Sequence, residues 1–115
     1  MARRKVFHGN KISYIDTRSI SSRNINLDDM IEFKYSGQDI YDSKPIVFIL
    51  EKSNDLIKGI NLNYLTDYKV QQLLQEVNFK KMQWYELYND SIRSYKTVKM
   101  KLIKKVQYKR DLDAT

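Results

Sequence analysis

The stretch that decides the fold runs from Tyr41 to Leu65 and reads YDSKPIVFILEKSNDLIKGINLNYL. It contains the single proline, Pro45, which is followed by an unbroken apolar run, Ile46 to Leu50, a polar turn and a second apolar run. β-Branched residues on both sides of a polar turn predict two paired strands, which we place at residues 45–51 and 57–65. Pro45 suits the first residue of a strand, where its missing N–H is not needed. The second run ends in apolar residues that alternate with asparagines, the pattern of a half-buried strand.

The flanking segments predict further strands and helices. Residues 30–35 alternate between polar and apolar side chains and predict a strand, and a short strand is expected near residues 11–15. Thr66 to Val77 predicts a helix, with Thr66 as its N-cap and an apolar stripe at helical spacing. The aromatic segment 79–90 predicts a second short helix. In residues 91–110 the apolar spacing fits both a helix and a strand, and we favour a helix because its Lys, Met, Leu and Gln residues are good helix formers.

Together these elements predict an α+β fold. Three or more antiparallel strands form a small curled sheet, for which an SH3-like barrel is one arrangement, and two or three helices follow. A length of 115 residues is typical of one domain. We assign residues 1–24 to a basic N-terminal arm and loop, 25–110 to a single α+β domain with a basic C-terminal helix, and 111–115 to a tail. The core is expected to bury six residues together: Val47, Ile49, Ile60, Leu62, Leu73 and Leu74.

The net charge of +7 is concentrated at the two ends of the chain. Residues 1–23 carry +5, residues 24–90 carry −4, and residues 91–110 carry +8 without a single acid. Solvated faces usually mix the two signs because like charges repel. The asymmetry therefore favours an anionic partner such as DNA or RNA, or self-association through complementary charges. The candidate partner-binding or nucleic-acid-binding residues are Arg3, Arg4, Lys5, Arg93, Lys96, Lys99, Lys101, Lys104, Lys105, Lys109 and Arg110.

Signatures of catalysis and cofactor binding are missing from the sequence. The chain has no P-loop, and its three glycines leave no G-x-G-x-x-G. Its one histidine, His8, has neither a second histidine nor a cysteine to share a transition metal with. Asp28 and Asp29 are neighbours before a strand and would point to opposite faces, which disfavours a shared ligand with Glu32. We therefore predict no enzyme, no catalytic, cofactor or metal site, and no small-molecule substrate.

Apolar residues are also too dispersed to indicate a membrane. No run of about 18 apolar residues is present, so no membrane-spanning segment is predicted. No apolar segment follows the basic N-terminus, so we do not expect secretion.

The central stretch resembles a motif of small proteins from tailed bacteriophages. In this chain the motif reads Tyr41-Asp42-x-x-Pro45-Ile46-Val47 and, after a turn, Gly59-Ile60-Asn61-Leu62-Asn63-Tyr64-Leu65. The resemblance covers about residues 30–106, and the chain lacks the aromatic and acidic ending of longer members. It implies a phage source, hence a location in the virion or the host cytoplasm, but it supplies no site residues.

Two functions remain open. The first is a non-enzymatic structural or assembly protein of the virion, which binds other virion proteins or further copies of itself through its arm and basic C-terminal region. The second is an accessory protein that contacts nucleic-acid phosphates through residues Arg93 to Arg110. We favour the first, because the phage resemblance and the long arm both point to assembly.

Overall fold

The computed structural model describes residues 10–35, 44–75 and 81–110. Within these ranges the chain forms six strands, two α-helices and four short 3₁₀ turns. The strands are β1 (Asn10–Tyr14), β2 (Met30–Tyr35), β3 (Ile46–Lys52), β4 (Leu56–Asn61), β5 (Ile92–Lys96) and β6 (Met100–Arg110). The helices are α1 (Asp67–Gln75) and α2 (Lys81–Leu87), and the 3₁₀ turns are η1 (Ser22–Asn24), η3 (Leu62–Tyr64), η4 (Asn89–Ser91) and η5 (Thr97–Lys99).

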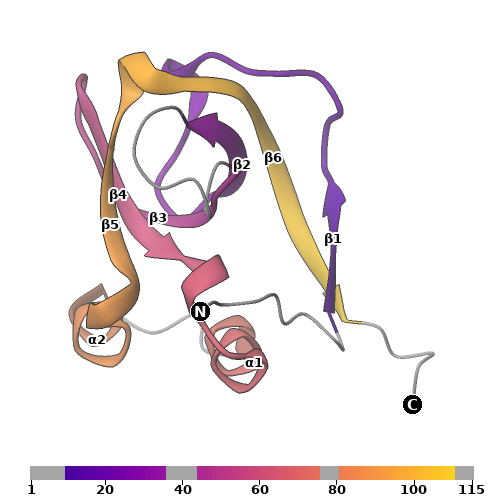
Figure 1. Cartoon of the computed structure of the whole chain (residues 1–115), viewed down its shortest axis with the longest axis vertical. Coiled ribbons are helices and arrows are strands. Elements are labelled where there is room, and N and C mark those ends of the chain that lie inside the picture. The colour runs from indigo at the N-terminus through magenta and orange to yellow at the C-terminus, as the bar shows by residue number, and fades with distance from the viewer. Residues whose placement is uncertain (1–9, 36–43, 76–80, 111–115) are drawn as a thin grey trace.

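The six strands form one antiparallel sheet in the order β1-β6-β2-β3-β4-β5. Strands β2 to β5 follow one another as a meander, and β6 then returns to lie between β1 and β2. The sheet is strongly curled, and both helices lie at the end of the molecule opposite η5 (Figure 1). The predicted α+β class with a curled antiparallel sheet is therefore confirmed.

Strand β3 lies in the middle of the sheet and explains the unbroken apolar run. All five residues from Ile46 to Leu50 are buried, because packed side chains cover both faces of this strand. A strand buried on both faces reads as a continuous apolar run rather than an alternating one. The predicted strands at 30–35 and 45–51 coincide with β2 and, within one residue, with β3.

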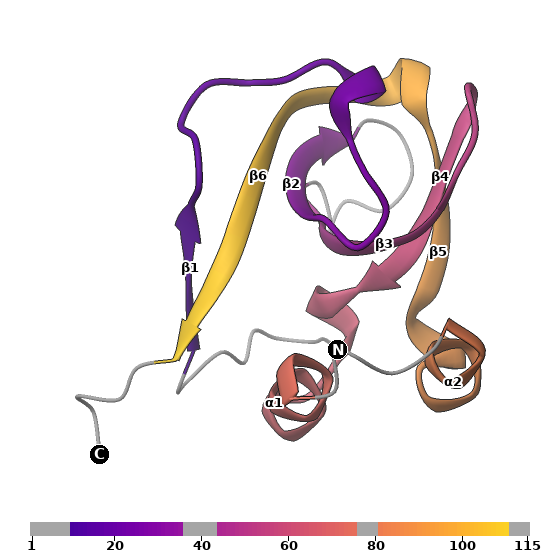
Figure 2. The ribbon, with the colours of Figure 1, turned by 180° about the vertical axis from the view of Figure 1, so that it is seen from behind.

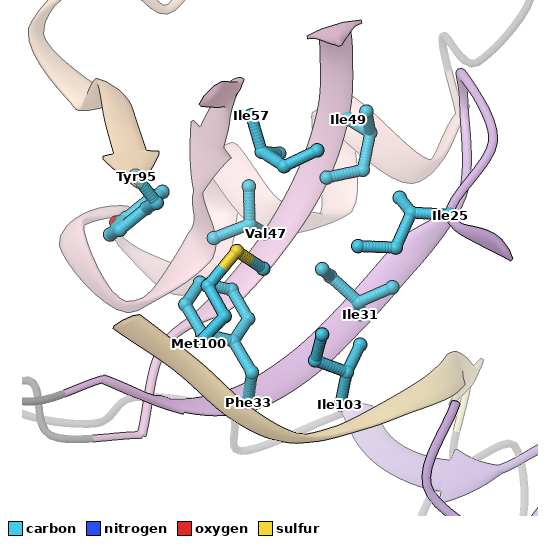
Figure 3. Packing of buried hydrophobic residues seen from close by; sticks show 9 residues of the cluster. All are labelled: Ile25, Ile31, Phe33, Val47, Ile49, Ile57, Tyr95, Met100 and Ile103. Carbon is cyan, nitrogen blue, oxygen red and sulfur yellow. The ribbon is translucent and has the colours of Figure 1, made fainter. Parts of the chain in front are cut away.

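Two separate cores lie on the two faces of the sheet. The first fills the inside of the curl, where side chains from β2, β3, β4, β5 and β6 point toward one another (Figure 3). The second lies between the outer face of β3 and β4 and the two helices, around Trp84. The prediction of a single core is wrong in this respect. Val47 and Ile49 belong to the first core, whereas Ile60, Leu62 and Leu73 belong to the second, with half-buried Leu74 at its edge.

The predicted basic C-terminal helix is wrong. Residues 92–110 form two strands, β5 and β6, joined by the single turn η5. A helix would satisfy its backbone locally, but here β6 pairs with β2 on one side and β1 on the other, and Met100 and Ile103 enter the first core. Intrinsic helix propensity is a weak preference that such tertiary pairing overrides.

The end of β4 differs from the predicted half-buried strand for a local reason. The strand stops at Asn61, whose side-chain oxygen accepts a 2.9 Å hydrogen bond from the backbone N–H of Asn63 and turns the chain into η3. The buried Asn61 amide also donates to the Tyr95 hydroxyl at 2.8 Å.

The N-cap prediction for α1 is confirmed, since the Thr66 hydroxyl accepts from the Lys69 backbone N–H at 3.2 Å.

The short strand expected near residues 11–15 is confirmed as β1, which pairs with the C-terminal half of β6. Residues 10–14 of the predicted N-terminal arm are thus a strand of the sheet. Figure 2 shows β1 running beside β6 on the outside of the curl, away from β3 and β4.

Candidate binding surface

The predicted basic residues do not form one helical face. Arg93 and Lys96 lie on β5, Lys99 in η5, and Lys101, Lys104 and Lys105 on β6. Lys109 and Arg110 occupy the last two positions of β6, where the backbone pairs with β1. Arg3, Arg4 and Lys5 lie outside the described residues.

Three of these basic side chains contact groups of the protein itself. Lys105 forms an ion pair with Asp29, with 3.1 Å between its nitrogen and the carboxylate oxygen. The Lys104 nitrogen lies 5.2 Å from the centre of the Tyr14 ring. The Arg93 guanidinium donates to the Asp90 backbone carbonyl at 2.8 Å and covers the ring of Tyr64. These contacts fix the three side chains partly within the fold.

The acidic residues considered in the sequence are separated. Asp29 faces Lys105 and accepts a 2.8 Å hydrogen bond from the Asn26 backbone N–H. Glu32 is buried and accepts a 2.8 Å hydrogen bond from the Tyr14 hydroxyl, and this bond, with burial and the Glu32 charge, raises the pKa of Tyr14. Within the described ranges, no three His, Asp or Glu side chains lie close enough together to hold a metal ion.

The other three predicted basic residues with described side chains lie in or beside η5 and form the most distinctive surface: Lys96, Lys99 and Lys101. We call residues 96–102 the basic turn. Lys96 and Lys101 are exposed and Lys99 is half-buried. Val98, between Lys96 and Lys99, is 85% exposed, and Leu102, which follows Lys101, is 60% exposed. Two apolar side chains are thus exposed to solvent close in sequence to three lysines.

The backbone of the basic turn is held firmly. Thr97 donates from its backbone N–H to the Asp55 carbonyl at 2.9 Å and from its hydroxyl to the Asn54 carbonyl at 3.1 Å. The Lys96 backbone N–H donates to the Tyr35 hydroxyl at 3.0 Å. Val98 is therefore displayed on a fixed scaffold, which lowers the entropy lost when a partner covers it.

Leu102 occupies a strained backbone position. Its φ is +53°, in the left-handed region that leucine rarely adopts. The strain lies at a register shift in which β2 advances two residues, from Glu32 to Lys34, while β6 recedes three, from Lys104 to Lys101. Such a bulge redirects side chains, and the extra residue here leaves an apolar group in solvent.

Like charges meet beside this bulge. Lys34 and Lys101 are directly opposite each other on β2 and β6, and both are exposed. Neither forms an ion pair with an acidic residue of the described chain. Like charges directly opposite destabilise an antiparallel pair, so an anionic partner at this position would stabilise the protein.

Sequence reasoning found the lysines of this surface but missed Val98, Leu102 and Lys34. Val98 and Leu102 belong to the apolar spacing of residues 91–110, which fits both a helix and a strand, and the structure exposes both side chains, Val98 in η5 and Leu102 on β6. A separate cavity of about 280 Å³ lies between η3, the start of α1, the end of α2 and η4, and it was also not expected.

Comparison with protein-family models, curated proteins and solved structures finds no match to this chain. Neither α1 nor α2, the α-helices of the described ranges, has the length and apolar character required to cross a bilayer.

Proposed function

We propose that this protein is a non-enzymatic, phage-encoded assembly protein that docks by its basic turn onto an acidic face of a neighbouring virion subunit. The observation that carries the proposal is the pair of exposed apolar residues, Val98 and Leu102, fixed among lysines. The phage-like motif at residues 41–65 supports the virion setting and a location in the virion or host cytoplasm.

Exposed apolar residues that neighbour lysines in the sequence favour a protein partner. Covering a valine or leucine side chain contributes roughly 1.5–3 kcal/mol, so burying what Val98 and Leu102 expose would contribute on the order of 2 kcal/mol each. The surrounding lysines would steer the encounter with an acidic surface. Backbone strain at an exposed residue such as Leu102 is retained where function requires it.

The proposed architecture behind this surface is an SH3-like barrel. The strand order β6-β2-β3-β4-β5 and the single 3₁₀ turn between β5 and β6 support it. That turn leads the chain from β5, the last strand of the meander, into β6, which pairs with β2, the first strand of the meander. In this arrangement α1 and α2 are an insertion between β4 and β5, and η5 with its exposed Val98 lies at the opposite end of the barrel (Figure 1).

Incorporation into particles tests the proposal. We expect Val98→Ser and Leu102→Ser each to weaken docking about 30-fold, which is 2 kcal/mol converted at 1.4 kcal/mol per tenfold. Tagged variants are produced during infection and quantified in purified particles. The matched control is Leu27→Ser, a 47% exposed leucine outside the basic turn. Equal incorporation of all three variants and the unaltered protein would refute the docking role.

A further inference from the structure

The cavity of about 280 Å³ lies at the end of the molecule that carries the two helices. Its wall comes from η3, the start of α1, the end of α2 and η4. The buried residues Leu65 and Tyr88 line it, and Leu87 and Tyr64 beside them are 40% and 38% exposed. The cavity therefore offers a concave, partly apolar surface.

Two carboxylates line this cavity without a cation to pair with. Glu86 lies near the end of α2 and Asp90 in η4, and both are exposed. Neither forms an ion pair with a basic residue of the described ranges. Both carboxylates are thus available to a cation from another molecule.

The basic side chains beside the cavity contact aromatic rings instead of these carboxylates. Lys69 also lines the cavity, but its nitrogen lies 5.5 Å from the centre of the Tyr88 ring. The Arg93 guanidinium lies 4.6 Å from the centre of the Tyr64 ring and donates to the backbone carbonyl of Asp90. The local positive charge is therefore already engaged.

The basic turn is complementary to the cavity in shape and in charge. Val98 projects from η5 with 85% exposure, and Lys96 and Lys101, on either side of it in the sequence, are exposed. The turn and the cavity lie at opposite ends of the molecule (Figures 1 and 2). The turn cannot reach the cavity of its own chain, whereas the turn of a second copy can.

We infer that the acidic face on which the basic turn docks is the cavity of a second copy of this chain. Val98 enters the apolar part of the cavity, and the lysines of the turn meet Glu86 and Asp90. Opposite potentials on the two surfaces steer such an encounter and fix its register. This inference rests on the proposed docking role of the basic turn and specifies its partner.

A contact between two different surfaces has a consequence for assembly. Each copy that places its turn in a neighbour still offers its own cavity to a further copy, which makes the contact heterologous. Heterologous contacts continue head to tail into a closed ring or an open filament, whereas an isologous contact stops at a dimer. The inference therefore predicts species larger than a dimer.

Reversed charges test the contact. The cavity variant is Glu86→Lys/Asp90→Lys, and the turn variant is Lys96→Glu/Lys101→Glu. Each variant alone sets like charges against each other, so its self-association should weaken at least about 10-fold. An equimolar mixture should restore association, because the turn of each variant then meets a cavity of opposite charge. Sedimentation velocity of the purified full chains from about 1 µM to 1 mM measures the association.

Two further variants complete the design. Arg18→Glu/Arg23→Glu makes the same change in charge as the turn variant at exposed positions outside the turn and the cavity, and it should associate like the unaltered protein. Val98→Ser should weaken association about 30-fold. Circular dichroism and Trp84 fluorescence check the fold of every variant.

Several results would overturn the inference. These are an unaltered protein that is monomeric at about 1 mM, a species that stops at the dimer, and a mixture no larger than its components. Incorporation into particles separates the inference from the proposed function. If Val98→Ser is depleted from particles while the cavity variant enters them normally, the turn docks on a different subunit, and only the second copy as partner is refuted.

Discussion

Gly59 on β4 has no room for a side chain. It lies opposite Ile49 on β3 and Arg93 on β5. A Cβ atom added there would lie 2.1 Å from the Phe48 carbonyl oxygen and 2.7 Å from a methyl carbon of Val47. Replacing this glycine with alanine is therefore a direct test of how closely β3 and β4 approach.

The cost of Gly59→Ala follows from which atoms must move. Non-bonded carbon contacts are favourable near 3.5–4.0 Å, so the new methyl must separate itself from the Phe48 carbonyl by more than about 1 Å. That carbonyl belongs to the backbone of β3, which is buried on both faces. Overpacking a core typically costs about 1–3 kcal/mol and occasionally more, and we expect at least 3 kcal/mol here. Total stability of a domain is about 5–15 kcal/mol.

Urea denaturation followed by the fluorescence of Trp84 measures the effect. The control is Ser94→Ala on β5, an exposed position where we expect a change within about 0.5 kcal/mol. Where space permits, Gly→Ala stabilises by about 0.4–1 kcal/mol through the unfolded state. The sign of the change is thus decisive: an unchanged or raised midpoint for Gly59→Ala would refute the close approach of the two strands.

Three further predictions concern α1, the second core and the basic turn. Leu73→Ala should cost about 2–5 kcal/mol because the side chain is fully buried, and Leu74→Ala should cost less but still lower the urea midpoint; no shift in either would mean that α1 does not pack there. Burial, together with a hydrogen bond to Glu51 and its charge, raises the pKa of Tyr85 to about 12, above its unfolded value of about 10. The resulting stability is complete below about pH 10 and is lost as pH rises to about 12. Phenol titration by NMR should show a lower Tyr85 pKa in Glu51→Gln, and an unchanged pKa would exclude that contact. Leu102→Gly should leave urea stability unchanged or raise it by about 1 kcal/mol, because relief of about 1–2 kcal/mol of left-handed strain offsets the cost of glycine; a loss above 1 kcal/mol would contradict the strain.

Elements with local signals were predictable from the sequence. The alternation at residues 30–35, the apolar run after Pro45 and the cap at Thr66 each indicate an element by itself, and β2, β3 and α1 agree with them. These signals depend on neighbouring residues only, so no knowledge of the distant chain is required.

Elements that depend on distant partners were not predictable in the same way. The spacing in residues 91–110 suits a helix as well as a strand, and the strand forms because β6 fills the position between β1 and β2. Asparagines alternate with apolar residues at the end of β4, yet the buried Asn61 caps a 3₁₀ turn there. Composition also cannot tell which face of the sheet a residue occupies, so the sequence predicted one core where the structure has two.

In the candidate site, too, some features have a local signal in the sequence and others depend on the fold. Lysines and arginines are recognisable from composition, because 91–110 contains eight of them and no acid. The exposure of Val98 depends on the turn η5, and that of Leu102 on the pairing of β6 with β2, where the bulge has no sequence signature such as glycine.

The position of β6 between β1 and β2 has a consequence for how the protein is made. On the ribosome, β1 emerges first, but the strand with which it pairs is synthesised about 90 residues later. The meander from β2 to β5 uses near neighbours and can assemble earlier, whereas the edge of β2 stays open until residues 100–105 leave the exit tunnel. An open edge is a template for intermolecular pairing. Slow translation of the codons for residues 100–105 should therefore promote aggregation of nascent chains, even though the finished protein has that edge covered.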